Sequence, residues 1–165
     1  MDTKTIIVTL VTDRTQADVE RVRELAAKGF AAMTADEQAE WMAGMKGAYN
    51  ASDLNRVGTA LNYLAARLAS ICGKSIAWAA KTDWAVTDII TASQAAEYRR
   101  QIQNIRDALT YPAGTPDAPQ LGRLTYTDAN NIERILKLCE DLIVNVAKSF
   151  RHTGAAECAA GGLLT

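Results

Sequence analysis

The chain of 165 residues has little of what most chemical sites need. It has a single histidine, His152, and only three cysteines, with no CxxC spacing. An odd number of cysteines without that spacing argues against both a disulfide framework and a zinc site. We therefore interpret Cys72, Cys139 and Cys158 as free thiols. Cys72 and Cys139 lie on apolar faces of expected helices, so we predict that they are core residues.

The sequence also lacks an excess of one charge and a long apolar run. Its 18 basic and 19 acidic residues leave a formal net charge of −1, which provides no electrostatic footprint for nucleic acid. No apolar run approaches the roughly 20 residues that a membrane-spanning helix needs, and the N-terminus has no signal-peptide pattern. We expect a protein that is made in the cytoplasm and has neither nucleic acid nor a membrane as a partner.

Sequence patterns for catalysis and for cofactor binding are missing too. The glycines form neither GxGxxG nor GxxxxGK, so no nucleotide site is indicated. The acidic pairs Asp36–Glu37 and Glu140–Asp141 are adjacent on expected helices, where neighbours point in different directions. We predict that both pairs lie on the solvated surface.

His152 is expected at the C-terminus of the last helix, where a histidine complements the helix dipole. A nucleophilic pair of His152 with Cys158 would lie in a tail that cannot hold the required geometry. We therefore predict no catalytic, cofactor-binding or metal-binding residues, and we expect that the protein is not an enzyme.

Capping residues and apolar periodicity predict an all-α fold of about five helices. The expected helices cover residues 15–28, 34–44, 52–73, 91–109 and 128–151. All three prolines lie between residues 111 and 119, where they end the fourth helix. Residues 74–90 are expected to be irregular or briefly helical.

Residues 5–11 form the only β-like run, Thr-Ile-Ile-Val-Thr-Leu-Val. A strand without a local partner indicates an extended arm that pairs with another chain. The tail after residue 151 is small and weakly patterned. We therefore predict a single bundle-like domain over residues 1–165, with these parts: an extended arm 1–12, a helical part 13–110, a Pro-rich linker 111–123, a long helix 124–151 and a mobile tail 152–165.

The last helix is apolar over nearly half of its surface, which indicates a central element contacted by several neighbours. Its seam follows alternating three- and four-residue steps. The seam comprises Ala129, Ile132, Leu136, Cys139, Ile143, Val146 and Phe150, and it is widened by Ile135, Leu138 and Leu142.

Two six-residue windows, Ser52–Val57 and Thr127–Ile132, are similar helix starts with Asp second and Asn fourth. We predict that Ser52 and Thr127 are the N-caps. Asn55 and Asn130 have two interpretations: each bonds its own cap, which we favour, or each makes an interhelical hydrogen bond that fixes register. The large aromatic residues Trp41, Tyr49, Trp78 and Trp84 are expected in the core, and Tyr63 is expected to be exposed.

Four stretches carry a resemblance to a known family, and they are residues 10–19, 47–64, 81–84 and 124–136. They resemble small proteins encoded in prophages of Gram-positive bacteria. In that family a tryptophan, a short polar gap and a helix start like Asp-x-Asn-Arg-Ile-Glu recur in virion structural proteins, chiefly of the tail region. This chain departs from the pattern at Gly58, where Glu is usual, and at Asn131, where Arg is usual.

The resemblance implies a non-enzymatic phage structural or adaptor protein of the tail or tail-fibre apparatus, located in the virion with other virion proteins as partners. A small helical regulator that is encoded by a prophage and binds a protein is the alternative. We also expect a homo-oligomer, because an unpaired strand and a broad apolar face are stabilised when a second chain covers them.

Overall fold

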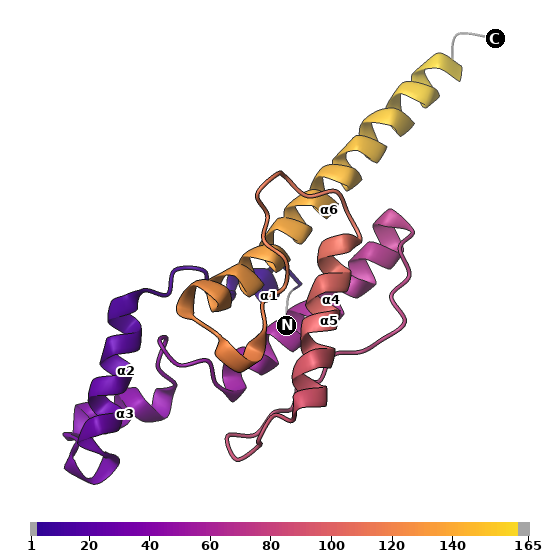
Figure 1. Cartoon of the computed structure of the whole chain (residues 1–165). Helices are drawn as coiled ribbons and strands as arrows, with labels where there is room; N and C mark the ends of the chain where they lie inside the picture. Colours follow the sequence, from indigo (N-terminus) through magenta and orange to yellow (C-terminus); the bar gives the residue numbers. More distant parts are fainter. Residues whose placement is uncertain (1–2, 162–165) are drawn as a thin grey trace.

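The computed structural model describes the backbone of residues 3–161 and the side chains of residues 6–150, and within that part the chain contains helices and no strand (Figure 1). The predicted all-α fold class is confirmed. The helices are α1 (Thr3–Val8), α2 (Gln16–Lys28), α3 (Ala35–Ala43), α4 (Ala51–Cys72), α5 (Ala92–Asp107) and α6 (Tyr126–Gly161), with 3-10 turns η1 (Phe30–Ala32) and η2 (Leu121–Arg123).

Three helices begin at the predicted residues because each has a capping box. The side chains of Thr15, Thr34 and Thr91 accept the backbone N–H three residues later, and the side chain at that later position bonds back to the cap. This reciprocal pairing satisfies two backbone donors that a helix start otherwise leaves without partners. Helices α2, α3 and α5 therefore start where local sequence alone places them.

The predicted caps of the other two long helices are wrong by two residues. Asn50 caps α4 in a capping box with Asp53. At α6, the Thr125 hydroxyl accepts from the Asp128 N–H at 3.1 Å, and the Thr125 N–H donates to the Asp128 carboxylate at 3.0 Å. In both helices the acidic residue selects a cap three positions earlier, so Ser52 and Thr127 lie in the first turn.

Helices α1, α4, α5 and α6 form the body of the molecule around one core (Figure 1). Helix α6 contacts each of the other three, as predicted for a broad apolar helix. Its predicted seam is buried from Ala129 to Ile143, whereas Val146 is half-buried and Phe150 is 64% exposed. The largest fully buried apolar side chains of the body are Val57, Leu61, Leu64, Leu68, Ile102, Ile105, Ile132, Ile135, Leu136 and Ile143.

Helices α2 and α3 form a small lobe at one end of the body (Figure 1). The lobe has its own cluster of Leu25, Met33 and Met45, against which Val22 and Trp41 pack. The return from α3 to the body passes directly over the start of α2. A Cβ at Gly47 would lie 2.1 Å from the carbonyl oxygen of Asp18, so only glycine fits this crossing.

The predicted extended arm is wrong, because residues 3–8 form helix α1. Ile6, Ile7 and Leu10 pack against the main core, and α1 contacts both α4 and α6. The β propensity of a Thr-Ile-Ile-Val run is weak compared with the gain from burying its apolar side chains on a preformed helical surface. An extended segment here would also find no neighbouring strand to pair with in the described part of the chain.

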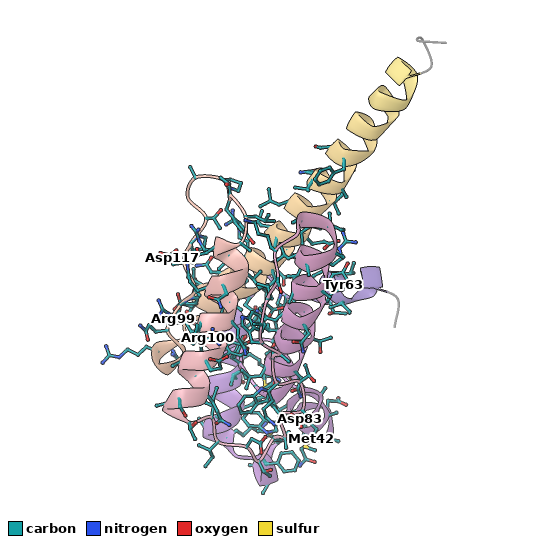
Figure 2. All side chains as sticks on the ribbon, turned by 90° about the vertical axis from the view of Figure 1, so that its right-hand side faces the viewer. Met42, Tyr63, Asp83, Arg99, Arg100 and Asp117 are labelled. Carbon is teal, nitrogen blue, oxygen red and sulfur yellow. The ribbon has the colours of Figure 1, made fainter. Side chains whose placement is uncertain are left out.

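The tail expected after residue 151 is also different, because α6 continues to Gly161. Residues 152–161 include four alanines and no proline, and alanine is the strongest helix former. The far end of α6 projects beyond the other elements in both views (Figures 1 and 2). The side chains of His152 and Cys158 lie outside the described residues.

The proline-rich stretch interrupts the helices as predicted, but it is fastened to α5. Ala118 is buried, its N–H donates to the Gln103 side chain at 2.8 Å, and its carbonyl accepts from Arg99 Nε at 2.9 Å. Arg106 donates to the carbonyl of Thr115 at 3.2 Å. This connection therefore lies along the surface of α5.

Candidate binding site

Asn55 and Asn130 each hold the backbone of a distant segment. Asn130 Oδ1 accepts from the Arg14 N–H at 3.0 Å, and its Nδ2 donates to the Arg14 carbonyl at 2.9 Å. Asn55 makes the same two bonds with Trp84, at 2.7 and 2.9 Å. The favoured interpretation, a bond to the local cap, is therefore wrong. The alternative is wrong about the partner, because the partner is non-helical backbone rather than another helix.

The two held segments resemble each other, and we call them the Arg14 segment (residues 10–14) and the Trp84 segment (residues 80–84). Their sequences contain Thr-Asp-Arg and Thr-Asp-Trp, and the asparagine holds the third residue in both. The Arg14 segment precedes α2 and is held by α6. The Trp84 segment precedes α5 and is held by α4. Helix α6 thus fastens a segment near the start of the chain, and α4 fastens the segment that follows it after a few residues.

The correspondence extends along both contacts. Three residues after Asn130, the Glu133 carboxylate accepts from the Val11 N–H at 2.6 Å. Three residues after Asn55, Gly58 faces Lys81, where an added Cβ would lie 2.2 Å from the carbonyl oxygen. Glycine therefore lets the Trp84 segment lie directly on α4, whereas glutamate binds the Arg14 segment to α6. The repeated Thr-Asp-x triplet is the sequence signal from which this pairing could have been found.

Four charged side chains, of which Arg14, Asp53 and Glu133 are buried and Arg56 is half-buried, join the Arg14 segment to α4 and α6. No single helix pattern predicts this group. Arg14 Nη2 lies 2.8 Å from Asp53 Oδ1 and 2.6 Å from Glu133 Oε1. Arg56 binds Glu133 through Nε at 3.0 Å and Nη2 at 2.8 Å, and it also contacts Asp53. With the Asn50 N–H on Asp53, all four carboxylate oxygens accept hydrogen bonds. This charge cluster is neutral in sum and holds the fold together.

Two tyrosines adjoin the charge cluster. The Tyr49 ring lies 5.6 Å from the Arg14 guanidinium carbon, and the Tyr49 and Tyr98 hydroxyls are 2.6 Å apart. Burial raises the pKa of both hydroxyls above the usual value, so both remain neutral across the physiological range. As predicted, Tyr49 belongs with the core, against which it packs together with Trp78.

The prediction that Tyr63 is exposed is wrong. Tyr63 is half-buried against the main core, and its hydroxyl donates to Glu140 at 3.3 Å. Glu140 also accepts from Arg67 at 3.0 Å, so it joins α4 to α6 instead of lying on the solvated surface. Burial raises the pKa of Glu140 above its usual value. Its neighbour Asp141 is exposed as predicted.

The cysteine predictions hold for the two thiols within the described side chains. Cys139 is fully buried and Cys72 is half-buried against the same core, and neither forms a disulfide. Burial raises the pKa of Cys139 to about 11, so this thiol stays protonated at neutral pH.

The candidate binding site is an apolar groove of about 530 Å³ between the lobe and the body. Trp41, Met42 and Met45 line it from the lobe side, and Trp84 and Val86 line it from the body side. Trp84 is 8% exposed and stacks under Lys81, whose Nζ lies 4.9 Å from the ring centre. Because Asn55 holds the Trp84 backbone, the wall of the groove is fixed to α4.

Exposed apolar side chains gather at this groove. Met42 is 75% exposed and Val86 is 95% exposed, and Ile89, at 88%, lies beside the lining residue Ile90. These are three of the six large hydrophobic side chains that are exposed in the described part of the chain. Figure 2 shows Met42 and Asp83 at the end of the molecule opposite the projecting part of α6.

Comparison of the chain with protein-family models, curated proteins and solved structures gives no match. Within the described residues, no three histidine, cysteine or acidic side chains are grouped so that they could hold a metal ion. The helices in that same part include none that is both long and apolar enough to cross a membrane.

Proposed function

We propose that this chain is a structural or adaptor component of a phage particle, belonging to the tail or tail-fibre apparatus, and that it works by binding proteins. The observation that carries the proposal is the groove between lobe and body, with Met42 and Val86 exposed in its lining. A concentration of exposed apolar side chains marks a surface that another protein covers.

The residues that carry the resemblance to phage proteins support this proposal through their contacts. Asn55 and Asn130 hold the Trp84 and Arg14 segments, and Asp53 pairs with Arg14 and Arg56. These side chains make their hydrogen bonds within the fold, and Asn55 fixes the backbone of Trp84, which lines the groove. A rigid surface loses little conformational entropy on binding, which favours a stable assembly.

Mass spectrometry of purified particles tests the proposal. After induction of a prophage that carries the gene, we expect the protein in intact particles, together with the other tail proteins. Met42→Glu places a charge on the groove and should deplete the protein from particles. Val8→Glu changes an equally exposed side chain on α1 and should leave incorporation unchanged.

Two results would contradict the proposal. The first is a protein that is abundant in the lysate but absent from particles in which other tail proteins are detected. That result favours the prophage-encoded regulator instead. The second is equal incorporation of the Met42→Glu and Val8→Glu variants, which would show that the groove is not the binding surface.

A further inference from the structure

We draw no further inference here: the strongest candidate, the apolar side of α6 that Leu142, Val146 and Phe150 form where this helix leaves the body, carries nothing because no contact in the described part of the chain shows what covers it.

Discussion

Arg56 and Glu133 form a two-point ion pair between α4 and α6, with Nε 3.0 Å from one carboxylate oxygen and Nη2 2.8 Å from the other. They come from the two similar helix starts. The first start keeps the arginine and has Gly58 in place of glutamate, whereas the second keeps the glutamate and has Asn131 in place of arginine. The two departures from the Asp-x-Asn-Arg-Ile-Glu pattern are therefore complementary in space, since α4 supplies the arginine and α6 supplies the glutamate of one ion pair.

Neutralising Glu133 should destabilise the fold strongly. The side chain is fully buried and both of its oxygens accept charged or backbone donors. In Glu133→Gln, Arg14 and Arg56 would share Asp53 as their only buried counter-charge. Breaking a buried ion pair in this way costs about 3–5 kcal/mol. Urea unfolding measures the loss, with Asp141→Asn on the exposed side of α6 as a control that should change stability by less than about 0.5 kcal/mol.

Removing the Asn130 side chain should release the Arg14 segment. Asn130→Ala loses two hydrogen bonds and leaves the N–H and C=O of Arg14 unpaired, at a cost of about 1–3 kcal/mol. Hydrogen exchange at the Arg14 amide should accelerate. Asn131→Ala is the matched control, because Asn131 is half-buried on the same turn and makes no described hydrogen bond. Equal losses of stability in Asn130→Ala and Asn131→Ala would show that the hydrogen bonds to Arg14 do not stabilise the fold.

Gly58→Ala should destabilise the protein although alanine favours a helix by about 1 kcal/mol over glycine. The new Cβ would fall 2.2 Å from the Lys81 carbonyl oxygen, so the Trp84 segment must move away from α4. We expect a net loss of about 1–3 kcal/mol and altered tryptophan fluorescence. Gly122→Ala, which meets nothing within 4 Å, should show neither change. A stabilised Gly58→Ala variant would contradict this packing.

The position of the α6 cap predicts a difference between two nearby threonines. Thr125→Ala loses the hydroxyl that accepts from the Asp128 N–H, at a cost of about 0.5–2 kcal/mol. Thr127 is exposed in the first turn, and Thr127→Ala should change stability by less than about 0.5 kcal/mol. Thermal unfolding of both variants provides the comparison. A larger loss of stability in Thr127→Ala than in Thr125→Ala would indicate that Thr127 is the cap.

The lobe should lose stability in acid through Glu37. A hydrogen bond from Lys28, together with one from the Thr34 N–H, lowers the pKa of Glu37 from 4.5 to about 2. A pKa that is lower in the folded state contributes stability that is present above pH 4.5 and is lost as the pH falls through about 2. Glu37→Gln should remove this part of the pH dependence. Urea unfolding of the wild type and of Glu37→Gln between pH 4.5 and 2 measures how the free energy of unfolding changes with pH. The same pH dependence in both proteins would contradict the prediction.

Features set by a few neighbouring residues could be predicted from the sequence. The capping boxes at Thr15, Thr34 and Thr91 place three helix starts, and the apolar steps along α6 identify its buried side. The same periodicity continues to Phe150, which is exposed because no neighbouring element reaches that far. A periodic pattern shows which side of a helix is apolar, but not where its neighbours end.

Contacts between distant residues were not predictable in this way. Asn130 has the local sequence of a capping residue, and its partner Arg14 lies 116 residues away. The run at residues 5–11 has β-branched residues, and its helical form depends on a surface that α4 and α6 supply together. The groove likewise depends on the lobe and the Trp84 segment meeting, which neither sequence pattern contains.

The nested arrangement of the two contacts, with Asn55–Trp84 lying between Arg14 and Asn130 in the sequence, also sets the order in which the newly made chain can be completed. Asn55 and Asn62 bind partners 29 and 18 residues further along, so the Trp84 segment can be fastened soon after it is synthesised. The Arg14 segment is made first but has no asparagine to hold it until α6 has been made. Closing so long a loop is the entropically expensive step, and it comes last. The N-terminal part of the chain therefore lacks its contacts with α6 through most of translation, although its contacts with α4 can form earlier.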